Sequence, residues 1–286
     1  MEDFVSETAH RVAIAVAPNG GRRTKTDHPA LPQSAAELAE TAAACLDAGA
    51  AMIHFHVRDA EGRHTLDADA YRQAIAAIRQ AVGERLVVQI TTEAVGRYAA
   101  REQMEVVRAV RPEAASLALR ELVPDASHEV EFSRFLSFMR QENIAPQIIL
   151  YHPDEALQLK AMMARGLVPF PDVPVLYVLG RYTEGQRSAP ADLLPFLDGA
   201  MPRFSHFMVC AFGAREAGCV TACGLLGGHA RVGFENNFFL ADGSIAHDNA
   251  AIVSGVGVAL AGLGMEIETA DGLRACWGLG APARGQ

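Results

Sequence analysis

The chain has 286 residues, of which 50% are hydrophobic and 21% are charged, a composition typical of a globular protein with a large core. Its net charge of -9 and the lack of a long basic run argue against a nucleic acid or an anionic membrane as partner. No apolar stretch reaches the roughly 18 residues of a membrane span, Met1–Glu7 does not resemble a signal peptide, and the five cysteines form no disulfide pattern, so we expect a cytoplasmic location.

Short apolar runs alternate with amphipathic helical patterns along the chain, which indicates repeated βα units and a parallel sheet. The expected strands are Val12–Ala17, Met52–Val57, Leu86–Ile90, Ala115–Leu117, Gln147–Leu150, Val173–Leu179, Phe204–Val209 and Ala230–Gly233. The expected helices are Ser34–Ala48, a helix that begins at Asp67 or Asp69 and ends near Val82, Arg101–Val110, Glu129–Gln141, Pro153–Arg165, Pro190–Leu197, Glu216–Leu226 and Asn249–Leu263. Eight such pairs without a linker predict one domain over residues 1–286, a closed (β/α)8 TIM barrel of the α/β class.

Such barrels carry their functional groups at the carboxyl ends of the strands and in the loops that follow. Polar residues are expected there at the following positions: Asn19, His54, His56, Arg58, Thr91, Thr92, Arg120, Glu121, His152, Arg181, Glu235, Asn236 and Asn237.

The segment Met52–Arg58 is the most informative of these. Side chains two apart on a strand share a face, so His54, His56 and Arg58 are expected to project together. Two neutral imidazoles suit a divalent metal, and barrel closure brings the end of strand eight close enough for Glu235 to be the third ligand. The alternative, two strand histidines with ordinary hydrogen-bonding partners, stays open on the sequence alone.

Here the chain resembles the β-keto acid cleavage enzymes, the family that includes 3-keto-5-aminohexanoate cleavage enzyme. The resemblance rests on His54–Asp59 with Gly62 behind it, Gly227–Asn237, Pro29–Pro32 and Gly243–Asn249. It implies a barrel enzyme that condenses a β-keto acid with acetyl-CoA, releasing acetoacetate and a new CoA thioester. It also implies zinc, or another divalent metal, on His54, His56 and Glu235, and a homotetramer.

Two further residues matter for catalysis under this resemblance. Arg231 matches the arginine of strand eight that would support a developing oxyanion, although pairing with a structural carboxylate is the alternative. Asn236 stands where the family carries an aspartate proposed for proton transfer, and an amide cannot act as a carboxylate base. Either another group moves the proton, or this member does different or no chemistry.

The remaining strand-end residues are interpreted as substrate-binding groups: Thr91, Thr92, Arg120, Glu121, Arg58 and Asn19. Thr91 keeps the hydroxyl of the family's Ser-Thr-Gly-Gly loop for anchoring a carboxylate, while Glu93 and Ala94 replace its glycines. The pair Arg120-Glu121 replaces a Gly-Ser or Gly-Thr pair. We hypothesise that Glu121 selects a substrate with a cationic end and that Arg120 holds a carboxylate. An exposed or mutually paired couple is the alternative.

Other cations receive weaker interpretations. The loop Asn19–Asp27 is interpreted as solvated, with an approach to substrate or CoA phosphates as the alternative. Arg181, Arg187 and Arg215 are further candidates for binding the acidic cosubstrate, and His206 is interpreted as a core histidine in mid-strand.

Two competing functions remain. One is a metal-dependent barrel hydrolase that uses His54-Phe-His56. The other is a metal-containing binding protein that has lost catalysis, which Asn236 favours.

Overall fold

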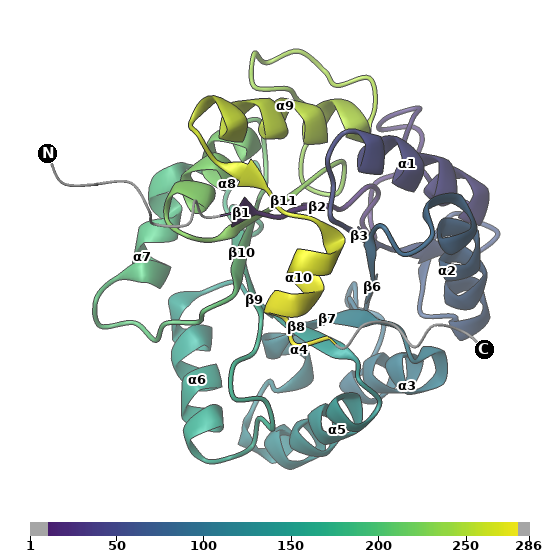
Figure 1. The fold of residues 1–286 in the computed structure, drawn as a ribbon. Helices are drawn as coiled ribbons and strands as arrows, with labels where there is room; N and C mark the ends of the chain where they lie inside the picture. The colour runs from purple at the N-terminus through teal and green to yellow at the C-terminus, as the bar shows by residue number, and fades with distance from the viewer. Residues whose placement is uncertain (1–10, 280–286) are drawn as a thin grey trace, which may run out of the picture.

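The computed structural model describes residues 11–279, so the expectation for Met1–Glu7 lies outside the described residues. Eight parallel strands close into a barrel that helices surround (Figure 1), with the order β10-β11-β2-β3-β6-β7-β8-β9. The strands are β2 (Ile14–Val16), β3 (Met52–Phe55), β6 (Val87–Thr91), β7 (Ala114–Ala118), β8 (Ala145–Leu150), β9 (Val175–Leu179), β10 (Phe207–Ala211) and β11 (His229–Val232). The predicted (β/α)8 barrel is confirmed.

The eight expected helices are present in the predicted order, one of them divided in two, and the short helices Leu119–Leu122 and Ala270–Cys276 were not predicted. They are α1 (Ala35–Asp47), α2 (Ala68–Val82), α3 (Ala100–Val110), α4 (Leu119–Leu122), α5 (Glu129–Gln141), α6 (Pro153–Ala164), α7 (Leu194–Leu197), α8 (Glu216–Leu225), α9 (Asn249–Gly262) and α10 (Ala270–Cys276), with 3-10 turns η1 (Ala126–His128) and η2 (Pro190–Leu193). The helix expected over Pro190–Leu197 is divided into η2 and α7. Pro195 has no N–H to continue a helical ladder, which accounts for the break.

Two apolar layers stabilise the barrel. The larger lies between strands and helices and includes Phe132, Phe135 and Tyr71, all fully buried. The smaller fills the barrel interior with small side chains such as Ala13 and Ala15 and with longer ones such as Met208. Because strand side chains alternate between the two layers, nearly every residue of the barrel strands is buried.

Three expected strands differ from the structure in ways that affect interpretation. The run Val12–Ala17 is split, because β1 (Arg11–Val12) pairs outside the barrel with β12 (Glu266–Ile267). The run Met52–Val57 is split at His56, after which β4 (Val57–Arg58) forms an antiparallel hairpin with β5 (His64–Thr65). His206 precedes β10 and is half-buried, so the interpretation of it as a mid-strand residue was wrong.

Helix α10 closes the amino-terminal end of the barrel. In Figure 1 it crosses the barrel at the centre of the view, and its Leu273 packs into the interior cluster. Arg274, with a side chain 4% exposed, donates from Nε to Glu113 Oε1 (2.5 Å) and from its terminal nitrogens to the carbonyls of Glu84 (2.8 Å) and Leu86 (3.0 Å). The carboxyl end of the barrel is therefore left for the functional groups.

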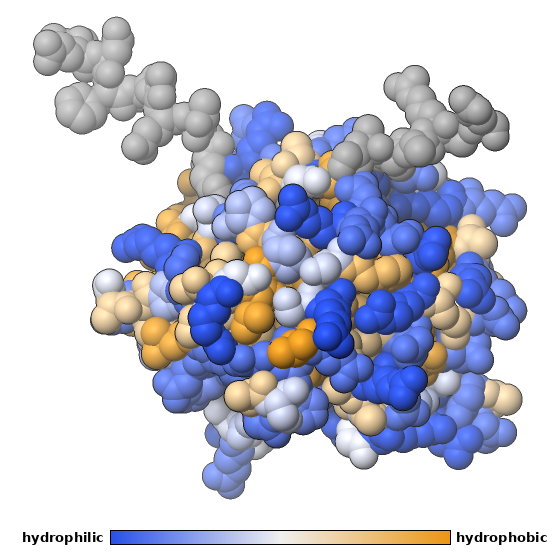
Figure 2. Space-filling view, turned by 90° about the horizontal axis from the view of Figure 1, so that it is seen from below, coloured by the Kyte–Doolittle hydropathy of each residue, from blue (hydrophilic) through white to orange (hydrophobic). Residues whose placement is uncertain are grey.

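The molecular surface adds one observation. Hydrophilic side chains cover most of the face seen in Figure 2, and hydrophobic ones form small separate patches. Within residues 11–279, no helix combines the length and the hydropathy needed to cross a bilayer.

Replacing Arg274 tests the closure by α10. Arg274→Met removes one of the two arginines that pair with the part-buried Glu113 and the donor to two carbonyls, and we expect it to lower the free energy of unfolding by about 2 kcal/mol. Urea unfolding followed by circular dichroism measures this. Arg72→Met is the control, because the Arg72–Asp69 pair is exposed and should contribute little. Equal effects of the two substitutions would contradict the account.

Candidate metal centre and active site

Three side chains from two neighbouring parts of the barrel converge at its carboxyl end. The Nε2 atoms of His54 and His56 lie 3.5 Å and 3.6 Å from Oε2 of Glu235. All three ligand atoms lie within 4.8 Å of one another. Ligand bonds of about 2.0–2.1 Å to a tetrahedral Zn²⁺ would separate ligand atoms by about 3.3 Å, so this spacing fits a divalent ion.

The unpartnered atoms of these residues also fit a metal. His56 Nε2 and Glu235 Oε2 are buried and accept or donate no hydrogen bond within the described part of the chain. Such atoms are costly unless a partner satisfies them. A cation held by one carboxylate oxygen and two imidazole nitrogens would do so, and we find that the donor set fits the metal that the resemblance implies.

The protonation states favour metal binding as well. Burial lowers the pKa of His54 to about 4 and that of His56 to about 3, so both rings are neutral and present a lone pair near pH 7. Burial raises the pKa of Glu235, but Arg231 together with the neighbouring His56 and His54 outweighs this effect and holds that pKa well below its usual range. The three groups are thus in the forms that ligate a metal.

A chain of hydrogen bonds through the barrel interior orients His54. Its Nδ1 lies 2.8 Å from Oε1 of Gln89, which can only accept, so Nδ1 carries the proton and Nε2 the lone pair. Gln89 in turn donates to Gln147 (3.1 Å), and Gln147 donates to the sulfur of Met208 (3.7 Å). Outer contacts of this kind fix the tautomer of a ligating histidine.

Arg231 lies directly beside the three converging groups. Its Nη2 donates to Glu235 Oε1 (3.1 Å), and its side chain is 4% exposed. Its Nε and Nη1 are buried without a hydrogen-bond partner among residues 11–279. Two unused donors next to the site are suited to binding a substrate oxygen.

Asn236 is held by contacts to protein groups. Its Oδ1 accepts from Arg231 Nη2 (3.4 Å), and its Nδ2 donates to Oε1 of Glu216 (3.2 Å). Glu216 is fully buried and also accepts from Asn237 and from the backbone N–H of Gly233. Burial raises the pKa of Glu216 to about 8, against the effect of these hydrogen bonds. Asn236 does not line the cavity described next.

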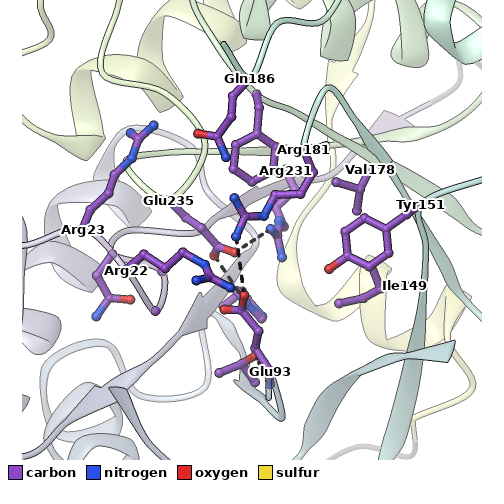
Figure 3. A pocket seen from close by; sticks show the side chains of 16 residues that line it. Arg22, Arg23, Glu93, Ile149, Tyr151, Val178, Arg181, Gln186, Arg231 and Glu235 are labelled. Carbon is purple, nitrogen blue, oxygen red and sulfur yellow. Dashed lines mark hydrogen bonds and ion pairs between the residues drawn. The ribbon is translucent and has the colours of Figure 1, made fainter. Parts of the chain in front are cut away.

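A cavity of about 120 Å³ opens beside the three converging groups (Figure 3). Its lining is Asn19, Gly20, Gly21, Arg22, Arg23, His54, Thr91, Glu93, Ile149, Tyr151, Val178, Arg181, Gln186, Phe212, Arg231 and Glu235. One wall is charged and comes from the loops after β2, β6 and β11. The other includes apolar side chains at the ends of β8, β9 and β10. The cavity thus has a reactive end, formed by His54, Glu235 and Arg231, and an apolar wall.

Glu93 lies in this cavity between the converging ligands and an arginine. Its Oε2 is 3.8 Å from Nδ1 of His56, and its Oε1 is 3.8 Å from Nη2 of Arg181. Burial, with a further contribution from the negative charge of Glu235, raises the pKa of Glu93 to about 7. The sequence analysis did not predict a functional role for Glu93, although its position just after β6 was a signal for one.

Asn19 and Arg58, both expected to bind substrate, form hydrogen bonds to the backbone around the site. Asn19 lines the cavity, but its amide accepts from the N–H of His56 (3.1 Å) and donates to the carbonyl of the same residue (2.9 Å). Arg58 does not line the cavity. Its guanidinium donates to the carbonyls of Gly20, Gly21 (3.2 Å) and Arg23 (3.0 Å) and so fixes the loop after β2.

The two threonines after β6 occupy different places. Thr91 lines the cavity, and its Oγ1 accepts from the N–H of Glu93 (3.0 Å). Thr92 lies outside the lining and donates to the carbonyl of Ser116 (2.9 Å). Thr91 therefore keeps the position expected of a substrate-binding group.

Arg120 and Glu121 lie in α4 and are absent from the cavity lining. Arg120 pairs with Glu155 (2.6 Å) and packs against the rings of Tyr151 and Tyr182. Glu121 accepts from the N–H of Ala94 (2.9 Å). The couple is thus neither exposed nor mutually paired, and its contacts support the loop after β6 and the packing around Tyr151.

Sequence reasoning assigned other cavity residues differently or not at all. The loop Asn19–Asp27 was interpreted as solvated, yet four of its residues besides Asn19 line the cavity; they are Gly20, Gly21, Arg22 and Arg23. Gly20 has a φ of +62°, and a Cβ there would lie 2.6 Å from Cγ of Glu235, so only glycine fits. Gln89 had a visible signal, a polar residue within an apolar strand. Glu216 had none, because a glutamate in the first turn of a helix is ordinary.

Comparison with known proteins decides the family. The family model described as beta-keto acid cleavage enzyme matches residues 11–279. The chain belongs to the β-keto acid cleavage enzyme family. It is 28% identical over 271 residues to a 3-keto-5-aminohexanoate cleavage enzyme of Fusobacterium nucleatum, covering 92% of this chain and 96% of the relative. It is 26% identical over 275 residues to a 3-oxoadipate:acetyl-CoA acetyltransferase of Cupriavidus necator, covering 93% and 94%.

Solved structures agree on the fold of this family member. A binary complex of ObcA with oxaloacetate superposes with a TM-score of 0.71 and 18% identity, covering 88% of this chain and 68% of that chain. This likeness concerns the barrel alone.

Removing the imidazoles tests the ligand set. We expect His54→Ala/His56→Ala to lose bound divalent metal, because a single carboxylate beside an arginine does not retain it. Elemental analysis of the purified protein measures metal per chain. His152→Ala is the matched control, since His152 is an exposed helix cap outside the cavity lining. Full metal content in the double variant would rule out this site.

Proposed function

We propose that the protein is a divalent-metal-dependent enzyme that cleaves a β-keto acid in exchange with acetyl-CoA. The observation that carries this proposal is the convergence of the ligand atoms of His54, His56 and Glu235, with Arg231 beside them. Of these ligand atoms, those of His56 and Glu235 are buried and unpartnered within residues 11–279. Family membership and relatives named for acetyl-CoA transfer support the cosubstrate.

The exchange balances without an external oxidant or reductant. The carbon between the keto group and the carboxylate loses a proton and attacks the acetyl carbonyl, which releases CoA as thiolate. The thiolate then attacks the original keto carbon, and the bond breaks between that carbon and the carbon that carries the carboxylate and the new acetyl group. Acetoacetate leaves after the proton returns to its carbon, and the rest of the substrate leaves as a new CoA thioester.

The residues of the chain have distinct tasks in this scheme. Held by His54, His56 and Glu235, a divalent cation would polarise the keto oxygen and so lower the barrier to forming the enolate. Arg231 presents Nε and Nη1, its two unused donors, to an oxygen on which negative charge develops. Thr91, the threonine that lines the cavity, is placed to contact the substrate.

Glu93 is the group we assign to the proton transfer. Asn236 is an amide whose oxygen and nitrogen are both engaged with Arg231 and Glu216. Of the carboxylates near Arg231, Glu216 does not line the cavity, and Glu235 is a metal ligand. Glu93 lines the cavity and is 3.8 Å from His56. Asn236 then serves to orient Arg231 rather than to carry a proton.

The metal and the assembly are finer parts of the proposal. We propose zinc from the donor set of two histidines and one carboxylate, which also binds manganese, iron or cobalt. The homotetramer rests on the resemblance alone and stays a prediction, which sedimentation velocity tests.

The first test is the exchange itself. We expect the metal-loaded protein to release acetoacetate from β-keto acids only when acetyl-CoA is present, with an equal amount of new acyl-CoA, measured by liquid chromatography and mass spectrometry. The His54→Ala/His56→Ala variant is the control and should be inactive. Hydrolysis without acetyl-CoA would favour the barrel hydrolase, and binding without turnover would favour a non-catalytic protein.

A second test concerns Glu93. We expect Glu93→Gln to slow turnover by about 10²–10⁴-fold, the usual contribution of a positioned base, with metal content unchanged. Enzyme-dependent exchange of the substrate's acidic protons for deuterium, followed by NMR against the enzyme-free rate, should fall in parallel.

Glu184→Gln is the control, because its side chain is exposed and lies outside the cavity lining. Exchange at the wild-type rate in Glu93→Gln would disprove the assignment. Loss of metal in that variant would instead make Glu93 a support for His56.

A further inference from the structure

Four arginines line the cavity, and two of them are already engaged. Arg23 donates to the carbonyls of Phe234 (2.9 Å) and Asn236 (3.4 Å) and packs on the ring of Phe238. Arg231 is bound to Glu235 at the reactive end. These two side chains therefore have structural or catalytic partners.

Arg22 and Arg181 are held less firmly. Within residues 11–279, neither guanidinium donates a hydrogen bond, and the ion pair from Arg181 Nη2 to Glu93 spans 3.8 Å, beyond hydrogen-bond distance. Figure 3 shows both side chains directed into the cavity, on either side of Glu93. The two guanidinium groups together carry ten N–H donors, and the carboxylate of Glu93 lies between them in the cavity.

The charge of the lining favours an anion. Arg22, Arg23, Arg181 and Arg231 contribute four positive charges, against two negative charges from Glu93 and Glu235. The excess is two positive charges, and a divalent ion on the ligand set would add two more. Glu121 lies outside the lining but acts on both Arg22 and Arg181, and its negative charge offsets part of this excess. A β-keto acid with one carboxylate supplies a single further negative charge, so the metal-loaded site still favours a second anionic group.

The opposite wall suits a short carbon chain. Ile149 and Val178 lie near the ends of β8 and β9, Phe212 follows β10, and all three line the cavity beside Tyr151. The guanidinium of Arg181 lies 5.1 Å from the centre of the Phe212 ring, so the apolar wall leads to a cation.

We propose that Arg22 and Arg181 form a second carboxylate site and that the preferred substrate is a β-keto dicarboxylic acid. This rests on the proposed function. One carboxylate, with the keto group, lies at the reactive end, and the other lies at the end of a short chain along the apolar wall. Guanidinium groups bind carboxylates by paired, charge-assisted hydrogen bonds.

A panel of substrates tests the second site. β-Keto acids of equal chain length, one set ending in a methyl group and one in a carboxylate, are compared with acetyl-CoA and the metal-loaded enzyme. We expect kcat/KM to be at least about tenfold higher for the diacids. Arg22→Gln and Arg181→Gln should each remove about tenfold of that preference, mainly by raising KM for the diacid.

A matched control is available on the same loop as Arg181. Arg187→Gln changes an exposed arginine absent from the cavity lining and should leave the preference unchanged. The absence of a diacid preference in the wild type would overturn the proposal. Equal losses on both substrate sets would also overturn it, because the arginines would then bind the carboxylate common to all β-keto acids or act on Glu93. A raised KM for acetyl-CoA alone would overturn it by assigning them to CoA phosphates.

Failure of the proposed function is distinguishable from failure of this site. If no β-keto acid gives acetoacetate, calorimetry on the metal-loaded protein with unreactive saturated diacids and monoacids still measures the second site. Tighter binding of the diacid that Arg181→Gln abolishes would support the site, and equal binding of the two acids would overturn it.

Discussion

The candidate site depends on the different roles of the two carboxylate oxygens of Glu235. Oε1 accepts from Arg231, while Oε2 has no hydrogen-bond partner within residues 11–279 and lies between the imidazole nitrogens of His54 and His56. A buried carboxylate is stable only when charge or hydrogen bonds balance it. Arg231 provides that balance on one side and leaves the other oxygen available to a metal, so the ionised form persists before any cation binds.

Several polar side chains near the substrate cavity serve the backbone rather than the ligand. Asn19 bonds to both the N–H and the carbonyl of His56, as a neighbouring strand would, at the residue where β3 has ended. Arg58 donates hydrogen bonds to three backbone carbonyls of the loop that carries Arg22 and Arg23. The imidazole of His56 and the arginines of the cavity are thus positioned by side chains that do not themselves need to touch substrate.

The sequence allowed the barrel and the convergence of His54, His56 and Glu235 to be predicted, because both depend on periodicities and on barrel closure. Alternating strands and helices give the architecture. In the closed barrel β2 lies between β3 and β11, which brings Glu235, after β11, to His54 and His56 at the end of β3. The roles of Arg58, Thr92 and Glu121 were not predictable in this way. Each lies near a strand end, but the direction of its side chain is set by the carbonyl or N–H groups of loops whose conformation no periodicity describes.

The chain of hydrogen bonds from His54 through Gln89 and Gln147 to Met208 can run from donor to acceptor in one direction only, and Met208 determines that direction. A thioether sulfur has no proton to give, so the Gln147 amide can only donate to it, and its oxygen must face Gln89. The same constraint passes to His54, where the proton must sit on Nδ1. A side chain with a hydroxyl at position 208 could reverse the whole chain and move the proton to the nitrogen that faces Glu235. A methionine on β10 therefore keeps a histidine on β3 in the tautomer that leaves the nitrogen facing Glu235 unprotonated.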